Sequence, residues 1–77
     1  MEISKMQELL ELCARVTRET DSDAFFGYSP FCIDVRMYES GFSEHEECES
    51  YSAYTEYDYE DVYERAKKRL NELLGGN

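Results

Sequence analysis

The distribution of acidic residues most constrains how this chain can fold. Residues 37 to 64 contain ten carboxylates and no lysine or arginine, whereas the rest of the chain holds eight acids and eight bases. The net charge of −10 therefore comes from one segment. Like charges closer than roughly 8 Å repel one another and destabilise a compact state, so a fold must place this segment at its surface. Solubility alone would explain acids spread over the whole surface, but not acids concentrated in one segment.

The length and composition indicate one small folded domain. A chain of 77 residues forms a single domain over residues 1–77 and buries only about 60% of the surface that it exposes when unfolded. A deep catalytic cleft is hard to build at this size. The hydrophobic fraction of 42% is ordinary for a globular protein, so we expect the chain to fold despite its charge.

Helical periodicity occurs near both ends of the chain. Apolar residues recur at helical intervals over residues 5–19, after a Ser4-Lys5-Met6-Gln7 capping-box spacing. A second helix is predicted over residues 59–74, with Asp58 as its N-cap and glycines after its end. The positions of Tyr59 and Tyr63 in the apolar stripe of this helix favour the core over an interface.

The middle of the chain favours strands. FCIDVRMYE alternates, with Phe31, Ile33, Val35 and Met37 on one face, and residues 48–56 have a β-favouring composition. We expect these two strands to pair antiparallel, and a short third strand is possible over residues 25–28, with Phe25 and Phe26 filling the core from a loop. The predicted fold class is α+β: helix-strand-strand-helix with a two- or three-stranded antiparallel sheet.

The sequence offers little for catalysis or metal binding. His45 is the only histidine, and the glutamates around it disfavour the thiolate that a Cys48–His45 pair would need. A structural zinc site needs four ligands, and no second Cys or His pair accompanies these two residues. Calcium-loop and phosphate-loop patterns are also absent. We therefore expect no enzymatic activity, no metal and no cofactor.

Cysteine usage and hydropathy suggest a cytoplasmic protein. Three cysteines are an odd number, and MEISKMQELL lacks the basic start and unbroken apolar core of a signal peptide. No run approaches the roughly 18 apolar residues of a membrane span, and an acidic surface is repelled by anionic lipid. The same charge argues against direct binding to nucleic acid.

The acidic segment also contains most of the tyrosines, and this combination points to a partner-binding surface. Carboxylates on alternate strand residues lie about 6.6 Å apart, and those one helical turn apart are separated by about 5 to 6 Å, spacings similar to those of backbone phosphates. Tyrosine is enriched at protein interfaces because its ring buries a large area. The candidate partner-binding residues are Glu44, Glu46, Glu47, Glu49, Tyr51, Tyr54, Glu56, Tyr57, Asp58, Glu60, Asp61 and Glu64.

In size, acidity and a charged segment between two helices, the chain resembles small phage-encoded DNA mimics, including many anti-CRISPR proteins. The resemblance is compositional and covers residues 39–64. It implies an inhibitor, monomeric or homodimeric, that occupies the basic DNA-binding groove of an effector nuclease in the host cytoplasm. Two alternatives remain open: an acidic interaction module, such as an immunity protein, for another basic partner, and a structural homo-oligomer that associates through its exposed strand and tyrosines.

Overall fold

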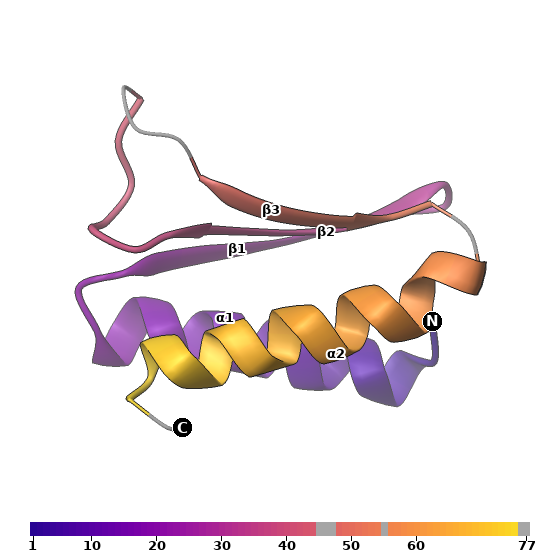
Figure 1. The fold of residues 1–77 in the computed structure, drawn as a ribbon, viewed down its shortest axis with the longest axis horizontal. Helices are drawn as coiled ribbons and strands as arrows, with labels where there is room; N and C mark the ends of the chain where they lie inside the picture. The colour runs from indigo at the N-terminus through magenta and orange to yellow at the C-terminus, as the bar shows by residue number, and fades with distance from the viewer. Residues whose placement is uncertain (45–47, 55, 76–77) are drawn as a thin grey trace.

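The computed structural model describes residues 1–44, 48–54 and 56–75, with the backbone alone for residue 56. It contains two layers, a sheet above and a pair of helices below (Figure 1). The elements follow the order α1 (Ile3–Glu19), β1 (Asp23–Ser29), β2 (Cys32–Tyr38), β3 (Glu49–Ala53) and α2 (Glu56–Leu73). The prediction of a small α+β domain is confirmed, and the possible third strand is present as β1.

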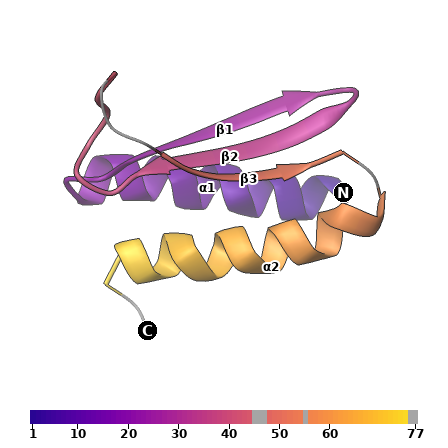
Figure 2. The same ribbon diagram turned by 45° about the horizontal axis from the view of Figure 1, so that its top comes forward.

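The sheet is antiparallel throughout, with strand order β1-β2-β3. β2 is the central strand, and alternation sends Ile33, Val35 and Met37 to one face, where all three are buried. The paired residues of β1 and β3 share this face; Phe26 and Tyr51, opposite Val35, pack against the core from either side. Both helices lie on this side and the opposite face is bare (Figure 2).

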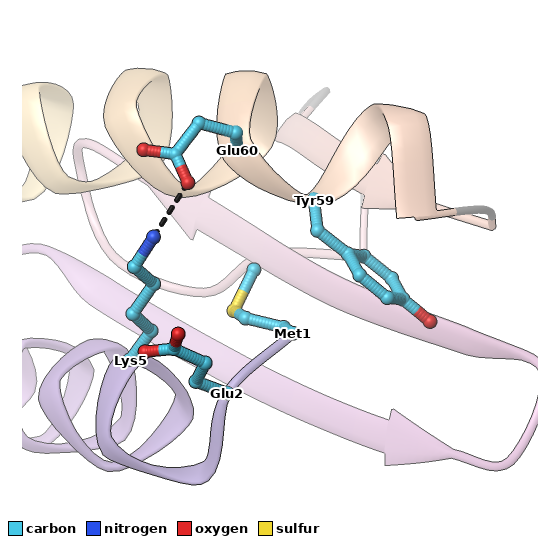
Figure 3. Close-up of a pocket in the computed structure, with 5 residues that line it drawn as sticks. All are labelled: Met1, Glu2, Lys5, Tyr59 and Glu60. Carbon is cyan, nitrogen blue, oxygen red and sulfur yellow. Dashed lines mark hydrogen bonds and ion pairs between the residues drawn. The ribbon is translucent and has the colours of Figure 1, made fainter.

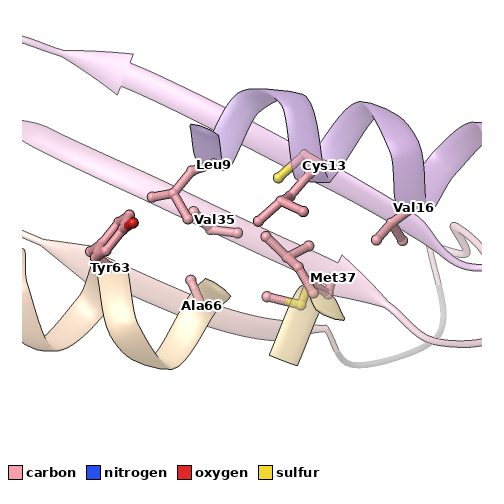
Figure 4. Packing of buried hydrophobic residues seen from close by; sticks show 9 residues of the cluster. Leu9, Cys13, Val16, Val35, Met37, Tyr63 and Ala66 are labelled. Atoms are coloured by element: carbon pink, nitrogen blue, oxygen red, sulfur yellow. The ribbon is translucent and has the colours of Figure 1, made fainter. Parts of the chain in front are cut away.

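The core lies between the sheet and the two helices. Figure 4 shows side chains of α1, β2 and α2 pointing toward one another. The central cluster of buried residues consists of Leu9, Leu12, Cys13, Val16, Val35, Met37, Tyr63, Ala66 and Leu70. Each fully buried aliphatic side chain contributes roughly 1.5 to 3 kcal/mol, so this single layer of packing is the main source of stability in so small a chain.

Both predicted helix starts were wrong. α1 begins at Ile3 with Glu2 as its N-cap, and no side chain caps it, so Ser4 does not form a capping box. The Glu2 carbonyl instead accepts the N–H groups of Lys5 and Met6 at 3.1 Å. α2 begins at Glu56, so Asp58 lies inside its first turn, where a carboxylate interacts favourably with the helix dipole.

Phe25, which was expected in the core, is exposed, and Phe31 lies outside the strand in which it was predicted. Residues 23–29 form a strand rather than a loop, so only alternate side chains face the helices. Phe26 does so and packs against the core, whereas Phe25 lies on the bare face and is 41% exposed. Phe31 does not continue the alternation of β2 because it occupies the β1–β2 turn, where it is 81% exposed.

Two adjacent leucines of α1 test this packing. Leu9 is fully buried and Leu10 is 54% exposed. Leu9→Ala should lower the free energy of unfolding by about 2 to 5 kcal/mol because it leaves a cavity in the core. Leu10→Ala should change it by less than about 0.5 kcal/mol. Urea unfolding of the two variants provides the comparison, and equal losses would contradict the packing described.

Candidate functional site

The predicted partner-binding residues separate into groups at the two ends of β3. Glu44 lies in the loop before this strand, whereas Tyr54, Tyr57 and Asp58 lie after it (Figure 1). A strand of five residues spans about 16 Å, which is longer than the screening length in physiological salt. Glu46, Glu47 and the side chain of Glu56 lie outside the described residues. The described acids therefore do not form one continuous array.

Basic residues of α2 neutralise part of the acidic segment. Arg69, with its side chain 23% exposed, contacts Glu49 at 2.8 Å and Glu39 at 3.3 Å. It thereby joins the last part of α2 to both ends of the β2–β3 connection. The hydrogen bond that Arg69 donates to the Glu49 carboxylate raises the pKa of Arg69. Glu49, a predicted partner-binding residue, has a structural role here because it holds the edge strand against the helix.

Two more predicted acids also have cationic neighbours. Glu60 pairs with Lys5 of α1, and this contact raises the pKa of the lysine. Asp61 pairs with Arg65 one turn further along α2, at 3.4 Å. Glu64 is exposed, and no ion pair joins it to another residue in the described part of the chain. Pairing leaves the net charge of the chain unchanged but reduces the local negative potential along α2.

The predicted tyrosines differ widely in exposure. Tyr51 is half-buried, and the guanidinium of Arg65 lies 5.3 Å from the centre of its ring. Tyr54 is 66% exposed and Tyr57 is 95% exposed. Tyr63 is buried, as its helical spacing predicts, whereas Tyr59 is only half-buried.

Exposed aromatic rings and carboxylates gather where β3 ends and both helices begin. The β1–β2 turn, which carries Phe31, reaches the same end of the molecule (Figure 1). We call this surface the tyrosine end and define it by Glu2, Phe31, Tyr54, Tyr57, Asp58, Tyr59 and Glu60. Sequence reasoning missed Glu2 and Phe31, since only the fold brings the N-terminus and the hairpin turn to the start of α2.

A hollow of about 370 Å³ lies at the tyrosine end between the first turns of the two helices. Met1, Glu2, Lys5, Tyr59 and Glu60 line it (Figure 3). Its apolar lining comes from Met1 and the half-buried Tyr59. Its carboxylates are those of Glu2, at the N-cap of α1, and Glu60 of α2. The ammonium of Lys5 also lies in this lining and pairs with Glu60, so an arginine or lysine of a partner that packs its aliphatic stem here would share these carboxylates with Lys5.

Next to this hollow, polar side chains link the two helices. Glu8 of α1 accepts a hydrogen bond from the Tyr63 hydroxyl at 2.7 Å and contacts the Lys67 ammonium at 2.8 Å. The contact with Lys67, and to a smaller extent the hydrogen bond from Tyr63, lowers the pKa of Glu8. The hydrogen bond to Glu8 raises the pKa of Tyr63. The link therefore joins the second turn of α1 to the middle of α2.

The bare face of the sheet carries a second aromatic group. The rings of Phe25, Tyr38 and Phe42 meet edge to face, with centroids 5.2 to 5.8 Å apart. Asp34, on the same face, pairs with Arg36 at 3.1 Å and accepts a hydrogen bond from Ser52 at 3.0 Å. The polar groups of Asp34, Arg36 and Ser52 thus satisfy one another on the bare face.

The described residues offer no metal site, and burial makes one of their thiols unreactive. Within residues 1–44, 48–54 and 56–75, no group of three His, Cys, Asp or Glu side chains is placed to hold a metal ion. Burial raises the pKa of the Cys13 thiol to about 12, which disfavours the reactive thiolate. The proposed partner of Cys48, His45, lies outside the described residues. Among the described helices, none has the length and apolar character to cross a bilayer.

Comparison with protein-family models, with curated proteins and with solved structures finds no match for this chain.

The link between the helices predicts a pH dependence of stability. Because the folded-state pKa of Glu8 lies below its unfolded value of about 4.3, its contribution is present above that pH and is lost as the pH falls through the folded pKa. Wild type and Glu8→Gln should therefore converge in stability on acidification. Urea unfolding across this pH range measures the difference, with exposed Glu11→Gln as the control.

An NMR titration locates this effect on one residue. In Lys67→Met, the pKa of the Glu8 carboxyl should rise toward its ordinary value because its strongest partner is gone. An unchanged Glu8 pKa in this variant would contradict the assigned contact.

Proposed function

We propose that this protein binds, through the tyrosine end, a basic nucleic-acid-binding surface of a partner protein and inhibits the partner by occupying that surface. The observation that carries the proposal is the convergence of exposed aromatic rings and carboxylates from the N-terminus, the hairpin turn and the start of α2. Each of these segments reaches the site only because the chain folds.

The exposed rings support an interface rather than a solvated surface. Tyr57, Phe31 and Tyr54 leave most of their area in water, although burying such a ring is strongly favourable. Aromatic anchors of this kind provide much of the binding energy when a partner desolvates them. The half-buried Tyr59 beside the hollow supplies a fixed apolar wall for such a partner.

Electrostatics supports a basic partner. The net charge of −10 attracts cationic surfaces over long range and speeds association with them. Glu2, Asp58 and Glu60 place carboxylates around the rings. The charges therefore speed the approach of a basic partner, and the aromatic contacts determine which surface of the partner stays bound.

Mimicry of nucleic acid is the specific form of this function that we propose. Asp58 and Asp61 are three residues apart on α2, and Glu60 and Glu64 are four residues apart. The Cβ atoms of each pair are therefore about 5 to 6 Å apart. A groove that binds DNA by neutralising phosphates accepts such carboxylates in competition with DNA. The resemblance to phage-encoded DNA mimics implies a CRISPR effector nuclease as the target class, because its arginines and lysines read a short DNA motif and track its strands.

Immobilised protein and a bacterial host lysate test the proposal. Wild type, Tyr57→Ala and Phe42→Ala are compared; Phe42 is an exposed ring on the bare face and serves as the matched control. A partner of the tyrosine end should be retained by wild type and Phe42→Ala. Tyr57→Ala should bind it about 30-fold more weakly, the loss typical of a central aromatic anchor.

Competition with DNA separates mimicry from other binding. Against the purified partner, affinity should fall steeply with salt, and a DNA duplex should displace the protein. Tight binding that DNA does not displace would contradict mimicry and assign the protein to the alternative class, an interaction module for another basic partner. Equal losses in Tyr57→Ala and Phe42→Ala would contradict the tyrosine end as the site.

A further inference from the structure

We propose that the free edge of β1 pairs with β1 of a second copy of this chain, so that two sheets join into one continuous antiparallel sheet about a two-fold axis. The proposal concerns the strand edge opposite β3 and is independent of what the tyrosine end binds.

The direction of the backbone groups identifies the open part of this edge. The Ala24 N–H donates to Thr17 Oγ1 at 3.0 Å, and the Ala24 carbonyl accepts from the same hydroxyl at 3.3 Å. Ala24 therefore points its backbone groups away from β2. Because these groups alternate along a strand, Phe26 and Tyr28 point the same way. In the described part of the chain, no hydrogen bond to the outward N–H and C=O groups of these two residues is found.

Gly27 lies between these two residues, and the single chain does not require a glycine there. Its φ is not positive, the β1–β2 register runs through it without a bulge, and an added Cβ would meet only Asp34, at 3.8 Å. Glycine weakens a strand interior, and where no bulge or bend explains it, it often marks the close approach of another backbone.

An antiparallel two-fold pairing centred on Gly27 satisfies every open group. Phe26 of one copy then lies opposite Tyr28 of the other, and each such pair exchanges both of its backbone hydrogen bonds. The two Gly27 residues face each other across the axis, with Cα atoms about 4.5 Å apart. Thr17 closes one end of the edge, and Pro30, which has no N–H, closes the other. The open groups are therefore self-complementary.

The surroundings of β1 are also suited to a second copy. Leu10 lies seven residues before Thr17 and so on the same side of α1, and it is exposed beside this edge together with Ile3. The side chain of Tyr28 is 67% exposed on the helix side of the sheet. Figure 2 shows the β1–β2 hairpin rising away from α1 toward its turn.

Charge distinguishes β1 from the other edge strand. The entire excess of acids lies in residues 37–64, which form β3, the loop before it and the start of α2. Pairing through β3 would bring Glu49 and its acidic neighbours of two molecules together. Pairing through β1 keeps these segments on the outer sides, separated by more than the screening length of roughly 8 Å.

Proline substitutions on the two edges test the proposal. Tyr28→Pro removes an outward N–H and blocks the edge, whereas the N–H groups that bond β2 stay intact, and proline is tolerated on edge strands. Ser52→Pro makes the same change on the outward side of β3 and is the matched control. By sedimentation equilibrium, the wild type should dimerise. Tyr28→Pro should weaken the dimer about 30-fold, since the two-fold axis removes each lost hydrogen bond twice, and Ser52→Pro should not.

Amide hydrogen exchange on the wild type keeps the proposal testable if a proline variant fails to fold. The amides of Phe26 and Tyr28 should become protected as concentration rises into the dimeric range, and that of Ser52 should not. A wild type that stays monomeric at millimolar concentration would overturn the proposal. A dimer weakened by Ser52→Pro alone, or protection of Phe26 and Tyr28 already in the monomer, would overturn it equally.

Discussion

Burial of one side of the central strand β2 beneath both helices is the interaction on which the rest of the structure depends. Val35 and Met37 are fully enclosed there by Leu9, Val16 and Leu70. A chain of this length supplies two helices, which are enough to cover only one face of the sheet. The other face, both strand edges, the hairpin turn and the starts of the helices therefore remain at the surface, and the candidate binding features lie among them.

Ion pairs at the surface surround this core. Basic residues of the two helices pair with acids of the segment that carries the net charge, as Arg69 does with Glu49 and Lys5 with Glu60. Such partly exposed pairs contribute little stability individually, but they limit local repulsion where strand and helices meet. At the tyrosine end, Glu60 keeps its pair with Lys5 and Asp58 accepts a hydrogen bond from the Tyr54 N–H, so the attraction of a cationic partner to this surface belongs to the proposed function.

The sequence was sufficient to predict the fold class and the central strand because alternation and helical spacing depend only on local order. It was insufficient where the outcome depends on distant residues. The Arg69 contacts with Glu39 and Glu49 join positions that become neighbours only after β3 pairs with β2. Phe31 was expected on the same strand face as Ile33 because it continues an alternating pattern, but the turn includes Phe31 and the strand begins one residue later, at Cys32. Composition also did not show that β3 separates the acidic segment into two groups, one at each end of the strand.

The central claim, that the tyrosine end is the surface recognised by a cationic partner, is tested most directly by NMR titration of the isotope-labelled protein with a short oligoarginine peptide. The account predicts that saturable shift changes concentrate at Glu2, Tyr54, Tyr57, Asp58 and Glu60, and that Tyr57→Ala weakens the binding. Changes of equal size at Glu39, Glu44 and Glu49, beyond the opposite end of β3, would show that charge alone governs the interaction and would contradict the account.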